Sequence, residues 1–126
     1  VRMAFEHRMA PLVTLADPPV TNERGLWEYR RHWEIVIFDE GVNVWFHTYT
    51  HGEPDWHQVA KLPMDLAAGT IHELTVTRQQ KTVTARIADR ELTIEVPNLP
   101  DWLHVGITGC EGVNRFYQFE LHQETI

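Results

Sequence analysis

The chain contains no serine and only one cysteine, Cys110, among its 126 residues. Without serine there is no Ser-His-Asp nucleophile. One cysteine can form neither an intrachain disulfide nor a zinc site built from several thiolates, and it favours a reducing compartment such as the cytoplasm. The first six residues lack the apolar segment of a secretory signal, and no stretch approaches the roughly 18 apolar residues of a membrane helix. We therefore expect no membrane partner.

Basic residues are also scarce, with 11 Lys and Arg against 18 Asp and Glu and a formal charge of −7. Proteins that bind duplex DNA gain most of their affinity from Lys and Arg that neutralise phosphates. The densest basic pair here, Arg30-Arg31, has acidic neighbours at Glu28 and Glu34. The composition therefore argues against a nucleic-acid partner. Eight histidines would bring the charge to −7 + 8 = +1 if all were protonated, which predicts sensitivity to pH between about 5 and 7.

The length and composition predict one globular domain over residues 1–126. Hydrophobic residues make up 43% and charged residues 23% of the chain, which excludes a disordered composition. Five Trp, three Tyr and five Phe accompany many Thr, Val and Ile, and these residues fit the half-buried surfaces of β-sheets.

Apolar and polar residues alternate with a period of two through most of the C-terminal half. Short polar or glycine-rich turns separate the alternating segments, which is typical of antiparallel strands with one core face. The segments centre on Leu74–Val76, Val83–Ile87, Leu92–Val96, Leu103–Ile107 and Tyr117–Leu121, the last with Tyr117, Phe119 and Leu121 as its apolar series. The sequence predicts an all-β fold, an antiparallel two-sheet β-sandwich (jelly roll) of about nine to eleven strands.

The N-terminal half is less regular. Residues 3–15 fit one long or two short strands, 16–25 a loop, 33–38 and 42–50 strands, 51–55 a turn, 56–61 a short strand, and 64–69 a weakly helical segment.

The most informative strand covers residues 42–51. Side chains alternate across a sheet, so its even and odd positions lie on opposite faces. The even positions Val42, Val44 and Phe46 suit a core. The odd positions are Asn43, Trp45, His47, Tyr49 and His51. An outward row of rings with hydrogen-bonding groups could bind sugars, which need both a flat apolar surface and polar partners. Burial of the same rings under a loop or a second sheet is the alternative.

Metal and catalytic motifs are absent from the sequence. His47 and His51 would lie about 13 Å apart on a strand, and there is no HExxH motif or EF-hand spacing. We therefore expect no metal or other cofactor. Glu34 and Glu40 share a strand face but would be about 20 Å apart, too far for the paired carboxylates of a glycosidase.

The C-terminal half resembles the concanavalin A-like lectin/glucanase superfamily, including laminin G-like jelly rolls. The residues that carry the resemblance are His72-Glu73-Leu74-Thr75-Val76-Thr77-Arg78, Thr82–Ile87, Leu103–Gly109 and Phe116–Leu121. The resemblance implies a jelly roll and, as a common outcome in that superfamily, carbohydrate binding. The acidic pattern of family 16 glycoside hydrolases and the galectin His-Asn-Arg-Trp set are not matched.

The sequence therefore favours a noncatalytic glycan-binding domain. Its expected ligand-binding residues are Asn43, Trp45, His47, Tyr49, His51, Trp56, Arg86 and His104. A small glycan-active hydrolase or lyase remains an alternative, with Glu34, Asp39, Glu40 or Glu111 as acids. The other alternative is an assembly module, in which the aromatic row would form the interface of a homodimer.

Overall fold

The computed structural model describes residues 1–7, 10–50 and 52–124, and these contain strands and loops but no helix. The strands are β1 (Arg2–Phe5), β2 (Pro11–Ala16), β3 (Val20–Thr21), β4 (Trp27–Glu28), β5 (Arg31–Phe38), β6 (Gly41–Thr50), β7 (Glu53–Pro63), β8 (His72–Gln79), β9 (Thr82–Ile87), β10 (Arg90–Glu95), β11 (His104–Gly109) and β12 (Asn114–Gln118). No helix long and apolar enough to cross a bilayer occurs in this described part of the chain.

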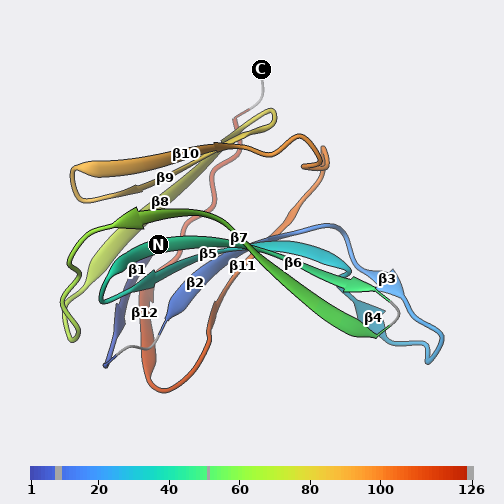
Figure 1. The fold of residues 1–126 in the computed structure, drawn as a ribbon, viewed down its shortest axis with the longest axis horizontal. Coiled ribbons are helices and arrows are strands. Elements are labelled where there is room, and N and C mark those ends of the chain that lie inside the picture. Colours follow the sequence, from blue (N-terminus) through green and yellow to red (C-terminus); the bar gives the residue numbers. More distant parts are fainter. Residues whose placement is uncertain (8–9, 51, 125–126) are drawn as a thin grey trace.

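Two five-stranded antiparallel sheets form the sandwich (Figure 1). One has the order β10-β9-β8-β1-β12 and is called the β8 sheet below; the other has the order β11-β2-β5-β6-β7 and is called the β6 sheet. The predicted all-β two-sheet sandwich is confirmed. The described residues form twelve strands, slightly more than predicted, because the expected loop over 16–25 contains β3, which pairs with the equally short β4.

The core lies between the two sheets and follows the period-two pattern. From the β8 sheet, Leu74, Val83, Ala85 and Ile87 point inward, each at most 3% exposed. From the β6 sheet come the residues Val13, Leu15, Trp33, Ile35, Ile37, Val42 and Val44. Leu66, Val96 and Leu99 come from loops and pack against the same cluster. Burial of this apolar area is the main stabilising contribution to the fold.

The N-terminal segment forms two strands in different sheets. β1 pairs with β8 and β12, whereas β2 pairs with β5 and β11. Periodicity left the choice between one strand and two open. The structure settles it, because each short strand buries apolar residues in a different sheet.

Three other expectations were wrong in detail. Residues 64–69 form no helix; Met64 N and Leu66 N instead donate to the carbonyls of Glu40 and Asp39. The short strand expected over 56–61 is the 11-residue β7, which also takes in part of the expected turn over 51–55. At the C-terminal end, Phe116 packs against the core while Tyr117 is 54% exposed, because Phe116 pairs with the buried Met3.

The hairpin between β5 and β6 sets the pairing register of these two strands, which carry the candidate functional residues described below. Gly41 begins β6 with φ +133, and an added Cβ would collide with the carbonyl oxygen of Leu62 and lie 3.0 Å from Met64 N. Only glycine accepts this close approach. The resulting register places Glu34 opposite Trp45 and His32 opposite His47.

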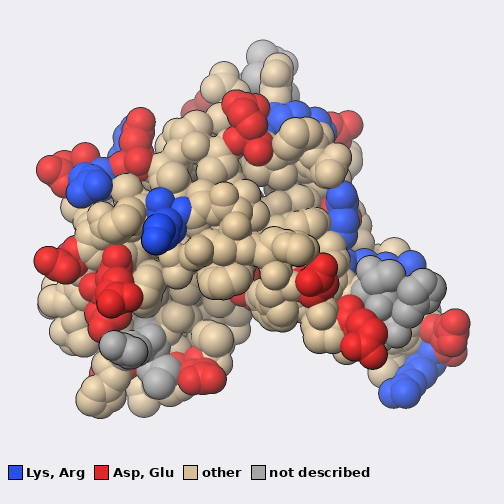
Figure 2. All heavy atoms as spheres, in the orientation of Figure 1, with Lys and Arg blue, Asp and Glu red and all other residues tan. Residues whose placement is uncertain are grey.

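Charged side chains lie mainly around the periphery of the molecular face seen in Figure 2, and its centre is largely uncharged. The acidic excess of the composition is therefore spread over the surface rather than gathered at one position on this face.

Candidate functional site

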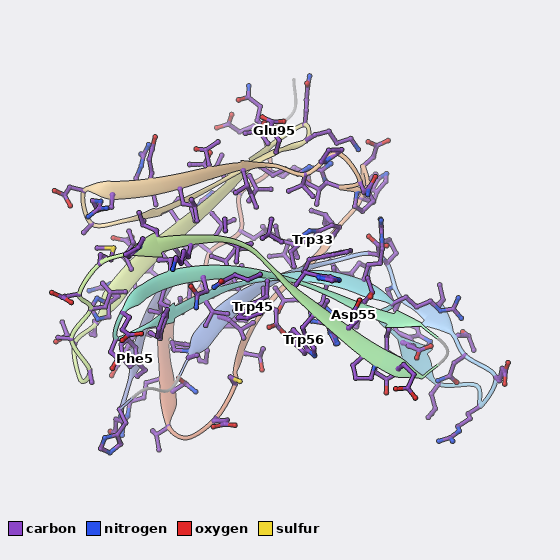
Figure 3. All side chains as sticks on the ribbon, in the orientation of Figure 1. Phe5, Trp33, Trp45, Asp55, Trp56 and Glu95 are labelled. Atoms are coloured by element: carbon purple, nitrogen blue, oxygen red, sulfur yellow. The ribbon has the colours of Figure 1, made fainter. Side chains whose placement is uncertain are left out.

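The odd positions of β6 face away from the core, as the sequence predicted. Val42 and Val44 are 1% and 2% exposed, whereas Tyr49 is 37% exposed and Trp45 is half-buried. In Figure 3, Trp33 lies on the side of the β6 sheet toward the β8 sheet, and Trp45 and Trp56 lie on the opposite side. We call this opposite side the outer face of the β6 sheet.

Neighbouring strands extend the outer face into a row that crosses the sheet. His47 is paired with His32 on one side and Trp56 on the other. His32 is paired with Ala16, and Ala16 with His104. The row therefore brings together residues from five strands of the sheet. At about 4.8 Å per strand spacing, its ends are roughly 19 Å apart.

A hydrogen-bonded group of three side chains, which we call the His32–Glu34–His47 cluster, lies at the centre of this face. His32 Nε2 is 3.1 Å from Glu34 Oε1 and 3.1 Å from His47 Nδ1. The side chains of His32 and Glu34 are only 15% and 17% exposed. Because an ionised carboxylate can only accept, His32 Nε2 must carry the proton of the first contact. His47 Nδ1 is then an acceptor, and a neutral His47 holds its proton on Nε2.

His47 is further constrained by the indole of Trp56. The two rings stack with centroids 3.7 Å apart and an interplanar angle of 12°. His47 Nε2 is buried and has no hydrogen-bond partner among the described residues. Burial lowers the pKa of His47, and the neighbouring His32 lowers it further, although Glu34 and Asp55 oppose the shift. These effects favour the neutral imidazole that the hydrogen bonds require.

Two open depressions meet at Glu34. The first, the histidine depression, has a volume of about 510 Å³, and its polar lining consists of Thr14, Tyr29, His32, Glu34, His104 and Thr108. The second, the tryptophan depression, has a volume of about 520 Å³ and is lined by Leu12, Glu34, Val36, Phe38, Asn43, Trp45, Trp56 and two further residues, Ala10 and Cys110. Both volumes are within the range of small-molecule sites, roughly 300–1,000 Å³.

The predicted site residues are only partly brought together. Asn43, Trp45, His47, Tyr49 and Trp56 share the outer face. His104 joins it from β11, where its Nδ1 lies 3.2 Å from the hydroxyl of Tyr29. His51 lies outside the described residues.

Arg86 does not reach this face. It belongs to β9 in the β8 sheet, and its guanidinium donates to Glu91 at 2.8 Å. Its side chain alternates with the buried Ala85 and Ile87, so it points away from the core on the other side of the sandwich. The expectation that Arg86 contributes to the same site is therefore corrected.

His32, Glu34 and Tyr29 were missed as binding residues. Alternation with the apolar residues Trp33 and Ile35 was the available signal, since it places His32 and Glu34 on the face opposite the core. Their proximity to His47 depends on the β5–β6 register, which alternation alone does not provide.

The arrangement offers binding groups more readily than a hydrolytic pair. Glu34 is the only carboxylate among the described residues that line either depression. Glycoside hydrolysis ordinarily uses two carboxyl groups on opposite sides of the scissile bond. Within residues 1–7, 10–50 and 52–124, no group of three or more His, Cys, Asp or Glu side chains has the geometry to hold a metal ion.

No family model, curated protein or solved structure matches this chain.

Proposed function

We propose that this protein is a noncatalytic glycan-binding domain whose ligand lies on the outer face of the β6 sheet. The observation that carries the proposal is the position of Trp45 and Trp56 beside the His32–Glu34–His47 cluster, over two depressions that share Glu34. The indoles supply flat apolar surface for the C–H groups of a sugar or for an apolar substituent that the sugar carries. The Glu34 carboxylate and the imidazoles of His32 and His104, which line the histidine depression, supply acceptors and donors for its hydroxyls.

The direction of the site also supports an extended ligand. The odd positions Asn43, Trp45, His47 and Tyr49 form one row along β6. The paired residues add a second direction, from His104 on β11 to Trp56 on β7. An oligosaccharide lying across the strands would reach the imidazoles and the indole together, whereas one lying along β6 would meet mainly the residues of that strand.

The two-sheet antiparallel architecture is compatible with a relationship to concanavalin A-like jelly rolls, and we keep that relationship as part of the proposal. Hydrolysis is less well supported, because Glu34 has no second carboxylate beside it in the described lining.

A glycan array tests the proposal with wild type, Trp45→Ala and Arg86→Ala. Selective wild-type binding should weaken by at least about tenfold in Trp45→Ala, the loss expected when a central tryptophan is truncated. Arg86→Ala, on the other sheet, should bind like wild type. Circular dichroism and light scattering would establish that each variant retains its fold and mass.

Two results would count against the proposal. If Arg86→Ala weakens glycan binding as much as Trp45→Ala does, the glycan does not bind specifically on the outer face. Absence of glycan binding, together with dissociation of a wild-type dimer on Trp45→Ala substitution, would identify the face as an assembly surface instead.

A further inference from the structure

The outer face of the β6 sheet carries apolar residues where ordinary alternation would place polar ones. An antiparallel sheet with a solvated face usually carries polar residues there. Leu12 and Val36 pair with each other and face away from the core, opposite Thr108 and Asn43 respectively. They are nevertheless only 3% and 8% exposed. These two residues form an apolar floor of the tryptophan depression.

The two depressions therefore differ in chemistry while sharing one residue. The histidine depression has hydroxyl, imidazole and carboxylate groups in its lining. In the tryptophan depression the described polar side chains are Glu34, Asn43 and the weakly polar Cys110, and the other side chains are apolar. A ligand that spans both depressions would meet a polar surface on one side of Glu34 and an apolar surface on the other.

Glu34 has one oxygen available at this junction. Oε1 contacts His32 Nε2, whereas Oε2 has no hydrogen-bond partner among the described residues. The Glu34 side chain is 17% exposed, and Oε2 is not buried. A carboxylate oxygen in this position would accept a hydroxyl proton and would disfavour an anionic group.

We propose that the ligand is an uncharged glycoside with an apolar aglycone, such as an aryl group. This inference rests on the proposed function and adds the ligand class. The sugar occupies the histidine depression and donates a hydroxyl hydrogen bond to Glu34 Oε2. The aglycone lies in the tryptophan depression against Leu12, Val36 and Trp45, where it is removed from water.

The test compares phenyl and methyl β-glycosides of glucose, galactose and mannose, with phenol as a third probe, by calorimetry and by tryptophan fluorescence. At least one phenyl glycoside should bind about tenfold more tightly than its methyl counterpart, because burial of an aromatic ring removes a large apolar area from water. That phenyl glycoside should also bind more tightly than phenol.

A second measurement locates the aglycone. Cys110 is the only cysteine in the chain and lines the tryptophan depression. Its reaction with a thiol reagent such as 5,5′-dithiobis(2-nitrobenzoate) should slow in the presence of the phenyl glycoside. The methyl glycoside at equal occupancy should protect it less.

Two near-isosteric substitutions form a matched pair. Val36→Thr adds a hydroxyl to the floor of the tryptophan depression and should remove most of the preference for phenyl over methyl glycoside. Thr14→Val changes the histidine depression and should weaken both glycosides to a similar extent. Cys110→Trp, at an exposed position, offers a second way to obstruct the tryptophan depression without changing its buried floor.

The outcomes separate the two proposals. Equal binding of phenyl and methyl glycosides, with no protection of Cys110, would overturn the aglycone assignment and leave glycan binding standing. Phenol that binds as tightly as every phenyl glycoside, together with no binding of any array glycan, would overturn the glycan-binding function itself and with it the ligand class. Failure of all the probes to bind, while array glycans still bind through Trp45, would overturn the ligand class alone.

Discussion

Replacement of Gly41 by alanine should damage the fold far more than the same change at Gly25. Both glycines have positive φ, at +133 and +75, so an alanine side chain strains the backbone at either position by about 1–2 kcal/mol. At Gly25 no other atom lies within 4 Å of an added Cβ. At Gly41 the Cβ would overlap the carbonyl of Leu62 and crowd Met64 N, and overpacking of this kind adds about 1–3 kcal/mol.

We therefore expect Gly41→Ala to lower the free energy of unfolding by about 2–5 kcal/mol, the sum of the strain and overpacking costs, and Gly25→Ala by about 1–2 kcal/mol, the strain cost alone. Urea unfolding followed by tryptophan fluorescence would measure both, and equal slopes would show that the comparison is one of stability alone. Similar losses in the two variants would refute the close contact between the start of β6 and the end of β7. The β5–β6 register that pairs Glu34 with Trp45 would then lose its structural basis.

Three further perturbations examine the core, the titration of the site and one ion pair. Ile37→Ala, at a fully buried position, should lower the free energy of unfolding by about 2–5 kcal/mol, whereas Ile71→Ala, at 43% exposure, should lower it by less than about 0.5 kcal/mol. Equal losses in urea unfolding would contradict the assigned core face of β5. Folding lowers the pKa of His47, so the unfolded chain binds the proton first as the pH falls below 6.5. The stability of the wild type should therefore decline below this pH more than that of His47→Phe. Parallel pH profiles of thermal unfolding for the two proteins would argue against this. The guanidinium of Arg31 donates to both carboxylate oxygens of Asp17, at 2.6 and 3.1 Å, and a lysine ammonium cannot reproduce this two-point contact. Arg31→Lys should therefore lower the free energy of unfolding by about 1 kcal/mol. Unchanged thermal stability would show that the ion pair contributes little.

The outward direction of Trp45 and His47 could be predicted because it depends on a local property. Val42 and Val44 alternate with Asn43 and Trp45, and a strand places alternate side chains on opposite faces. The same reasoning applied to Trp33 and Ile35 would have placed Glu34 outward. The weakly helical character of residues 64–69 was less informative, because the amides of Met64 and Leu66 donate to carbonyls of the β5–β6 turn instead.

The composition of the site could not be obtained in this way. Trp56 is among the expected ligand-binding residues, but its stack on His47 depends on the long pairing of β6 with β7. Arg86 carried plausible chemistry, but β9 belongs to the other sheet. Alternation specifies the face of a strand and contains no information about the sheet to which that strand belongs.

The amino-acid sequence by itself determined that this chain is an all-β sandwich and which side of its most regular strands packs inward, because both follow from the two-residue period of hydrophobicity over neighbouring residues. Only the tertiary structure decided that His32, His47 and Trp56 lie in one row and that Glu34 joins two depressions. Those relationships depend on strand order and pairing register. They are set by packing between segments far apart in the chain and by a glycine turn that tolerates no side chain.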